Sequence, residues 1–195
     1  MLRVIGGKYK RRLLDQPDKS ITRASKDILK EGLFNSLGDI SNKTFLDCFS
    51  GSGAIAIEAL SRGCKKVIGI EIDKSSYILI LSNINILYIN EDIKIYNDDF
   101  YKIINKLNMT FDIVFIDPPY IYNINKEFID NLYNNRIINN DSIIIIERDN
   151  ELDINEFNGY NIKELKYGRS KLYILRGKKE YEKNWYISRK FWSNY

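Results

Sequence analysis

Two adjacent prolines, Pro118 and Pro119, follow an apolar run and stand between Asp117 and Tyr120. The chain has only three prolines in 195 residues, so the pair marks a special position. Because proline has no N–H to donate to a β-ladder, a strand that reaches this point must end at Asp117. Ligands of open α/β sheets bind at the carboxyl ends of the strands. The sequence therefore predicts that Asp117 lies at a ligand-binding rim.

A second group of candidate ligand-binding residues lies in the segment LDCFSGSGAIAIEAL, residues 46–60. Gly51 and Gly53 would permit a tight turn and a close approach of backbone N–H groups to a ligand at a helix N-terminus. Glu71 ends the next expected strand, 18 residues after Gly53, about where an acidic residue accepts ribose hydroxyls. The spacing up to Ala56 also fits a dinucleotide fingerprint, so a nicotinamide cofactor stays open at this point.

Asp47 and Phe49 extend this loop into a more specific pattern. Asp47-x-Phe49-x-Gly51-x-Gly53 resembles the first motif of S-adenosylmethionine methyltransferases. The resemblance implies that Asp47 lies near the methionine ammonium, or a water bound to it, while the glycines pass the nucleoside. A cationic ligand suits an acidic pocket better than a pyrophosphate does.

Asp98, in the segment YNDDF, ends the third expected strand. Under the same resemblance it would accept from the adenine amino group. Alternatively, Asp98 or Asp99 caps the helix that follows.

With that cofactor, the segment DPPY at 117–120 resembles the motif of methyltransferases that act on planar amino groups. Such an amine is a poor nucleophile because its lone pair is delocalised into the ring. The Asp117 carboxylate and the Pro118 carbonyl could accept its hydrogens and turn the nitrogen toward the methyl group, with Pro119 stiffening the turn. Tyr120 offers a ring against which an extruded base can stack. The alternative is an Asp-Pro-Pro turn with a core tyrosine.

The elements that must position these residues alternate between short β-rich runs and longer segments of helical period. This pattern predicts a parallel sheet with crossover helices, its strands buried on both faces. Strands are expected at 44–48, 66–71, 93–96, 112–117 and 142–147, and helices near 53–62, 74–88, 99–107 and 125–136.

The two ends of the chain carry different elements. Residues 160–177 predict an antiparallel hairpin around Gly168. At the other end, residues 2–14 predict a small hairpin that turns at Gly6-Gly7. A helix follows from about Ser25 and ends before Gly38. Its expected buried face is formed by Ile28, Leu29, Leu33 and Leu37.

Composition excludes several chemistries. The chain has no histidine, and Cys48 and Cys64 are its only cysteines, so neither a Cys/His zinc site nor a His-based triad is expected, and no metal. It has no apolar run of membrane-spanning length and no signal-peptide pattern at its start, which predicts a cytoplasmic protein. Residues 1–30 carry nine Lys/Arg against three Asp/Glu, and residues 176–195 carry six against two, on an acidic body. Basic ends can hold a polyanion, although a charged run is commonly only a solvated face.

The flanking segments resemble one family. RVIGGKYKRRLL, TRASKDILKEGLFNSL and YGRSKLYILR, together with the two central motifs, occur in the order and spacing of bacterial 16S rRNA guanine-N2 methyltransferases. The resemblance runs from about Leu2 to Arg176. Arg11 stands where the family usually has glycine, and Ala24 replaces a usual proline.

The resemblance implies a Rossmann-like, seven-stranded class I methyltransferase sheet with an N-terminal hairpin and helix. The expected units are an RNA-facing extension at 1–40, the methyltransferase domain at 41–177 and a basic aromatic tail at 178–195. It implies S-adenosylmethionine as cofactor, a guanine of 16S rRNA or the small ribosomal subunit as substrate, and a monomer. The expected phosphate contacts are Lys8, Lys10, Arg11, Arg12 and Arg23, each of which could instead be an ordinary solvated side chain.

Three other functions stay open from the sequence. A DNA amino-methyltransferase can share the DPPY motif, but the chain has no room for a target-recognition region. A dinucleotide oxidoreductase would lack a substrate domain. A catalytically idle cofactor- or RNA-binding module would not need the intact Asp117 and its prolines.

Overall fold

The computed structural model describes residues 2–16, 23–119 and 122–178, and for residues 23–26 it describes the backbone alone. The central feature is a seven-stranded sheet in the order β5-β4-β3-β6-β7-β9-β8. Strands β3 to β7 are parallel, and β9 joins β7 antiparallel. The predicted fold class is confirmed. The strands are β3 (Thr44–Asp47), β4 (Lys66–Ile70), β5 (Ile93–Tyr96), β6 (Ile113–Ile116), β7 (Ile143–Arg148), β8 (Tyr160–Tyr167) and β9 (Ser170–Gly177).

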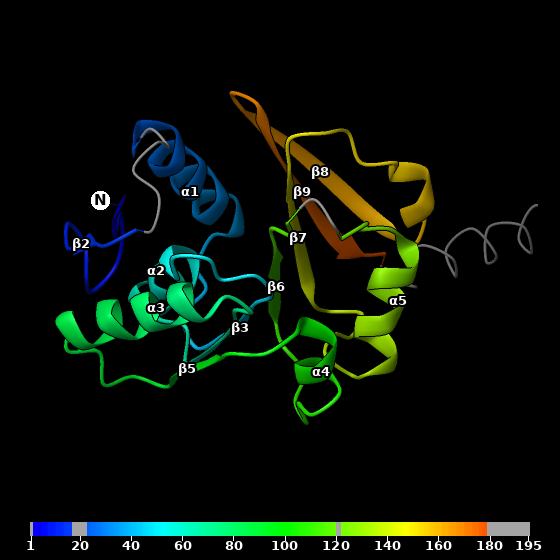
Figure 1. Cartoon of the computed structure of the whole chain (residues 1–195). Helices are drawn as coiled ribbons and strands as arrows, with labels where there is room; N and C mark the ends of the chain where they lie inside the picture. Colours follow the sequence, from blue (N-terminus) through cyan, green and yellow to red (C-terminus); the bar gives the residue numbers. More distant parts are fainter. Residues whose placement is uncertain (1, 17–22, 120–121, 179–195) are drawn as a thin grey trace, which may run out of the picture.

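Helices cover both faces of this sheet (Figure 1). Helices α1 and α2 pack on one face through a cluster that includes Leu33, Phe34 and Phe45. Helices α4 and α5 pack on the other through Phe100, Phe128 and their neighbours. The alternation of β-rich and helical segments thus produced the layers it predicted. The helices are α1 (Arg23–Leu37), α2 (Ala54–Ser61), α3 (Lys74–Ile86), α4 (Phe100–Ile104) and α5 (Lys126–Asn134), with a 3-10 turn η1 at Ile154–Phe157.

Helix α1 ends where the sequence predicts, because Gly38 adopts a φ of 73° and donates its N–H to the Phe34 carbonyl. Its buried face differs from the prediction. Ile28 is 56% exposed, whereas Lys30 is 3% exposed. The prediction for Ile28 was wrong because a polar residue, Lys30, occupies the buried stripe.

Lys30 is buried because it joins an ionic network. Its Nζ donates to the Arg3 carbonyl and lies 3.8 Å from the Glu58 carboxylate. Glu58 is fully buried on α2 and also pairs with Arg62 at 2.8 Å. Burial lowers the pKa of Lys30, against the opposing effect of Glu58 and then Asp27. These charges fasten α1 and the N-terminal segment to α2.

The N-terminal hairpin consists of β1 (Leu2–Arg3) and β2 (Leu13–Leu14), which pair antiparallel. The turn of its loop lies at residues 8–11, directly after the predicted Gly6-Gly7, and the Gly7 carbonyl accepts from the Lys10 N–H at 3.2 Å. Gly7 also packs against the end of α2. A Cβ on Gly7 would lie 1.8 Å from the Ser61 carbonyl oxygen, and Gly7 has a φ of 71°. The next N–H, of Lys8, donates to that carbonyl at 2.7 Å. Glycine is required here by close approach as well as by conformation.

Candidate active site

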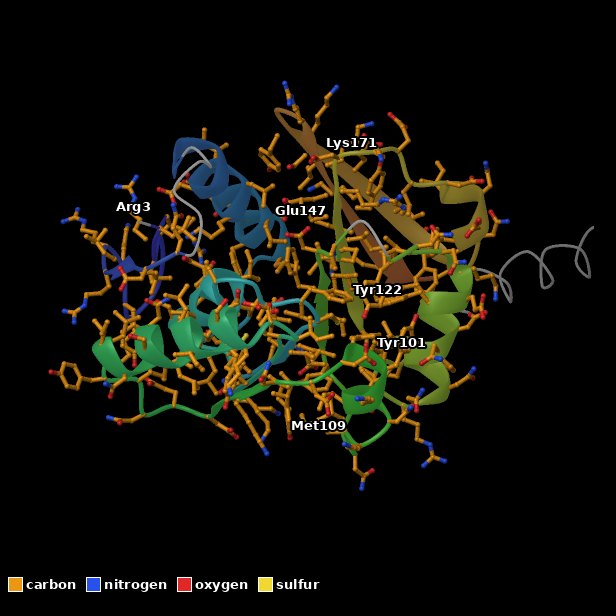
Figure 2. The ribbon with its side chains drawn as sticks, in the orientation of Figure 1. Arg3, Tyr101, Met109, Tyr122, Glu147 and Lys171 are labelled. Carbon is orange, nitrogen blue, oxygen red and sulfur yellow. The ribbon has the colours of Figure 1, made fainter. Side chains whose placement is uncertain are left out.

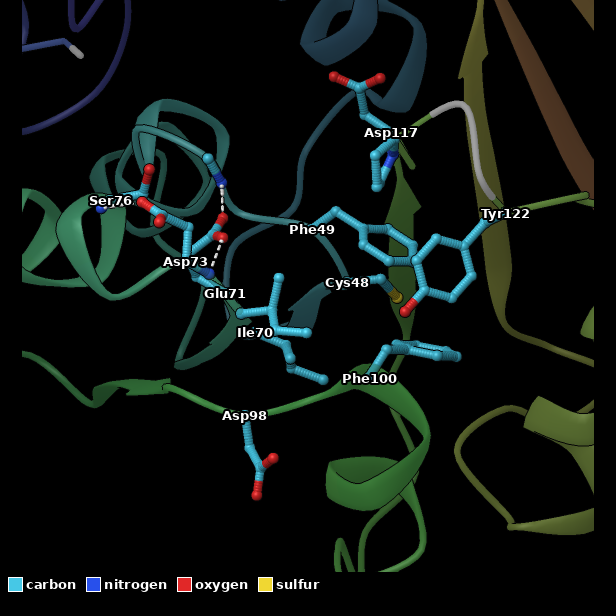
Figure 3. A pocket seen from close by; sticks show the side chains of 13 residues that line it. Cys48, Phe49, Ile70, Glu71, Asp73, Ser76, Asp98, Phe100, Asp117 and Tyr122 are labelled. Carbon is cyan, nitrogen blue, oxygen red and sulfur yellow. Dashed lines mark hydrogen bonds between the residues drawn. The ribbon is translucent and has the colours of Figure 1, made fainter.

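The expected site residues collect at the carboxyl ends of the parallel strands (Figure 3). β3 ends with Asp47, while Glu71 and Asp117 directly follow β4 and β6. A cavity of about 450 Å³ opens along this rim. We call it the aromatic cavity, because Phe49, Phe100 and Tyr122 form part of its wall. Of the predicted residues it brings together Phe49, Gly51, Glu71, Asp98, Asp117 and Pro119.

The glycine loop at the mouth of this cavity is held in one conformation. Gly53 has a φ of 75°, and a Cβ there would lie 2.8 Å from the Ile80 side chain. Gly51 has a φ of 53° with nothing within 4 Å of the Cβ position, so its open side faces the cavity. Its N–H donates to Glu71 Oε2 at 2.7 Å, while Glu71 Oε1 accepts from the Asp73 N–H at 2.7 Å. Glu71 therefore braces two loops, and each carboxylate oxygen keeps a further lone pair for a ligand.

Asp47 is the most unusual charge in the site. It is 1% exposed, and neither carboxylate oxygen has a hydrogen-bond partner of good geometry among the described residues. Burial, and secondly the negative charge of Asp117, raise its pKa to about 7, although the Phe49 N–H and the Ser50 hydroxyl oppose this. A buried carboxylate without a partner is costly unless a ligand supplies one. Asp47 fits a cationic donor such as an ammonium group.

Asp47 lines a second cavity, also about 450 Å³, on the α1 side of the rim. Asp117, Glu147 and Asp149 line it too, with Lys30 as a nearby cation. We call it the acidic cavity. Although four carboxylates border it, no group of three within the described residues is arranged to hold a metal ion.

Asp98 does not point at the aromatic residues; in Figure 3 its side chain is directed away from Phe49 and Tyr122. Its Oδ1 accepts from the Asp99 N–H at 2.8 Å and from Lys102 Nζ at 3.3 Å. The Asp99 N–H, and secondly Lys102, lower the pKa of Asp98. Asp99 is the residue that caps α4, through the N–H groups of Tyr101 and Lys102. Adenine recognition by Asp98 therefore stays a prediction.

Asp117 lies where three hollows meet. It lines the aromatic cavity, the acidic cavity and a smaller cavity of about 240 Å³, which Pro118 and Pro119 also line. Its carboxylate points toward α1 in Figure 3. Asp117 and Asp47 both line the acidic cavity. Tyr120, the predicted stacking residue, lies outside the described residues.

Two aromatic residues that the sequence did not single out complete the aromatic cavity. Tyr122 and Phe100 flank Phe49, with ring centroids 4.9 Å and 5.3 Å from it. The Tyr122 hydroxyl donates to Asp99 Oδ2 at 3.1 Å, which fixes the ring. The available signal was their position, since Phe100 ends the segment YNDDF, two residues after Asp98, and Tyr122 lies two residues after the segment DPPY.

The predicted phosphate-contacting cations separate into two kinds. Lys8 pairs with Glu91 beside α3, so its charge is already partly neutralised. Lys10, Arg11 and Arg12 are exposed. Arg11 has a φ of 73°, which accounts for the glycine usual at this position in the family that the sequence resembles. The side chain of Arg23 lies outside the described residues.

Comparison with known proteins agrees with this geometry. Residues 2–176 match the family described as Conserved hypothetical protein 95. The chain belongs to this family. Ribosomal RNA small subunit methyltransferase D of Buchnera aphidicola subsp. Baizongia pistaciae is 33% identical over 154 residues, which is 78% of each chain. The Escherichia coli K12 protein of the same name is 32% identical over 77% of this chain and 76% of its own.

Solved structures extend the similarity to three dimensions. The Escherichia coli protein yhhF superposes with a TM-score of 0.75 at 28% identity, over 91% of this chain and 99% of its own. SMU.776, solved in complex with SAH, gives a TM-score of 0.61 at 17% identity over 77% of this chain and 49% of its own, and so shares the fold. The chain is a methyltransferase of the class I S-adenosylmethionine-dependent fold, related to small-subunit rRNA methyltransferase D. No helix within the described residues has the length and apolarity to cross a membrane.

Proposed function

We propose that this protein transfers the methyl group of S-adenosylmethionine to the exocyclic N2 amine of a guanine in 16S rRNA of the small ribosomal subunit. The observation that carries the proposal is the position of Asp117, which borders both the aromatic cavity and the cavity of the buried Asp47. Pro119 lines the aromatic cavity, and both prolines line the smaller cavity beside Asp117. The relatives named as small-subunit rRNA methyltransferases D supply the substrate class.

The residues present fit this cofactor. Asp47 is a buried acceptor whose carboxylate has no hydrogen bond of good geometry among the described residues, so it could accept from the methionine ammonium. Glu71 would accept the ribose hydroxyls from beside Gly51, and the rings of Phe49, Phe100 and Tyr122 form an apolar wall for adenine. When bound, S-adenosylmethionine supplies a methyl group from a sulfonium, whose sulfur keeps the electron pair of the broken bond.

Asp117 would act on the amine. Its carboxylate, together with the Pro118 carbonyl, accepts the N2 hydrogens and turns the nitrogen lone pair toward the methyl group. As the N–C bond forms, the nitrogen becomes acidic and gives a proton to Asp117 or to water. No histidine base is needed for this step.

The exposed cations of the hairpin would approach the RNA backbone. The rim itself is acidic, so a polyanion needs attraction from elsewhere, and Lys10, Arg11 and Arg12 lie exposed on the N-terminal segment. We assign phosphate contact to these three before Lys8, which is paired.

The test is incubation of the purified protein with labelled S-adenosylmethionine and, in separate reactions, unmodified small-subunit RNA, small-subunit particles or duplex DNA, followed by nucleoside analysis. We expect the label in N2-methylguanosine. Label in N6-methyladenine of DNA, or in no nucleoside of either RNA substrate, would contradict the proposal.

A further inference from the structure

A third carboxylate of the rim, Glu147, stands beside Asp117. Strands β6 and β7 are parallel neighbours, and Ile116 pairs with Ile146, so the next residues, Asp117 and Glu147, lie at the same level. Paired residues of adjacent strands direct their side chains to the same face, and the strands are about 4.8 Å apart. Figure 2 shows Glu147 at the end of β7, near α1.

Glu147 also faces the same space as Asp117. The two residues border both the acidic cavity and the smaller 240 Å³ cavity, which Pro118 and Pro119 wall. Glu147 is half-buried, as expected for a side chain within such a hollow. Asp149, the other acidic residue shared by these cavities, is exposed and accepts from the Ser170 hydroxyl at 3.1 Å.

The sheet order gives the substrate a direction. Along β4-β3-β6-β7, the proposed cofactor residues Glu71 and Asp47 come first, Asp117 follows, and Glu147 is last. A base held by its amine at Asp117 faces the methyl group on the β3 side. On the other side of Asp117, toward β7, Glu147 lines the same two cavities, so the amine-bearing edge of the base can extend there.

The chemistry of that edge matches a carboxylate. Guanine carries an N1–H donor directly beside its N2 amine, whereas a carboxylate has only acceptors. We propose that Glu147 accepts the N1–H of the target guanine and so determines the choice of base. The inference rests on the proposed function and goes beyond it by naming the group that distinguishes guanine from a base whose N1 is an acceptor.

The test uses 2-aminopurine, which keeps the exocyclic amine but has a lone pair in place of the N1–H. Single-turnover transfer is measured on small-subunit RNA that carries either guanine or 2-aminopurine at the modified position. Wild type should prefer guanine by at least ~10²-fold, because a site built for a donor rejects a base that lacks it. Glu147→Gln should reduce this preference by ~10-fold or more, since an amide can donate to the N1 lone pair.

The matched control is Glu151→Gln, the same substitution at a nearby side chain that is 82% exposed and pairs with Lys171. It should keep the wild-type preference. An unchanged preference in Glu147→Gln, or an equal loss on both RNAs with normal melting and cofactor affinity, would overturn the inference. If Glu147→Gln has a lower melting temperature than wild type, Glu147→Asp is measured instead. This variant retains a carboxylate and must therefore keep the preference for guanine over 2-aminopurine.

These outcomes separate the inference from the function on which it rests. A wild-type protein that methylates no guanine would contradict the proposed function itself. A wild-type protein that methylates guanine and 2-aminopurine equally would contradict only the role of Glu147.

Discussion

The two large cavities that meet at Asp117 have similar volumes and both include carboxylates, but they differ in their remaining lining. The aromatic cavity is walled by Phe49, Phe100 and Tyr122, while the acidic cavity is bordered by Asp47 and Glu147 as well as Asp117. Apolar rings suit a nucleoside, whereas carboxylates suit the donors of an ammonium and of a base edge. Under the proposed function, this difference means that the rim would bind cofactor and base by separate groups and that Asp117 would lie where the two ligands meet.

The largest effect is expected at that meeting point. Asp117→Ala should reduce methyl transfer by at least ~10²-fold, the scale for losing a group that positions an amine or accepts its proton. Cofactor affinity should change little, because the proposed cofactor contacts are Asp47, Glu71 and the aromatic wall. Single-turnover rates and equilibrium binding measure the two quantities. Normal turnover would show that the site is assigned wrongly.

The next largest effect is expected for cofactor affinity when the buried carboxylate of Asp47, in the acidic cavity, is replaced. Asp47→Asn should weaken S-adenosylmethionine binding by ~10- to 100-fold, the loss of one hydrogen bond to a charged group. Wild-type affinity should rise with pH up to about 7, where Asp47 ionises, and the variant should show no such rise. Calorimetry between about pH 5.5 and about pH 7 keeps most of the ligand ammonium charged.

The same residue predicts a stability change of opposite sign in the cofactor-free protein. The folded pKa of about 7 exceeds the ordinary value of 3.8, so the unfolded chain releases this proton first and stability falls as pH rises between those values. Asp47→Asn removes the penalty and should melt higher than wild type at pH 8, by up to ~2–4 kcal/mol of unfolding free energy. Equal pH dependence in both proteins would mean that Asp47 has a partner in solution.

How far the sequence predicted this rim depends on the range of the interactions involved. Asp47, Glu71 and Asp117 were placed correctly because strand ends follow from local patterns of β-rich runs, glycine and proline. The orientation of Asp98 depends on Lys102 and on the Asp99 N–H, and the neighbourhood of Glu147 depends on strand order. The Lys8–Glu91 pair joins residues 83 positions apart, and Lys30 is buried by charges on other elements. The partners of Asp98 are only one and four residues away, so a local pattern could have indicated them. No local pattern encodes the neighbourhood of Glu147, the Lys8–Glu91 pair or the burial of Lys30.

A smaller effect is expected where the hairpin offsets the acidity of the rim. Replacing Lys10, Arg11 and Arg12 together by alanine should flatten the plot of log K for RNA against log salt by roughly 1 to 2.5 units, since each phosphate contact contributes about 0.7 to 0.9. Lys8→Ala should change the slope less, because Glu91 already pairs with it. A salt titration of RNA binding compares these proteins, with unchanged S-adenosylmethionine affinity as the control. Parallel lines for the triple variant and wild type would remove the hairpin from RNA binding.

The smallest effect concerns the backbone of that hairpin. Arg11 occupies the left-handed region at a φ of 73°, so Arg11→Gly should raise the free energy of unfolding by ~0.5–1 kcal/mol in urea titrations. The slope of log K for RNA against log salt should change by no more than the contribution of one phosphate contact, about 0.7 to 0.9. A destabilised variant would mean that the arginine side chain holds the hairpin together.

The separate roles proposed for Asp117 and Glu71 are tested most directly by comparing two variants in two assays. Asp117→Asn and Glu71→Gln are compared for S-adenosylmethionine affinity and for single-turnover transfer at saturating cofactor. Asp117→Asn should lose transfer and keep affinity, whereas Glu71→Gln should lose ~1–3 kcal/mol of binding and recover transfer once saturated. If both variants lost both properties in the same proportion, the two cavities would not have the separate roles described above.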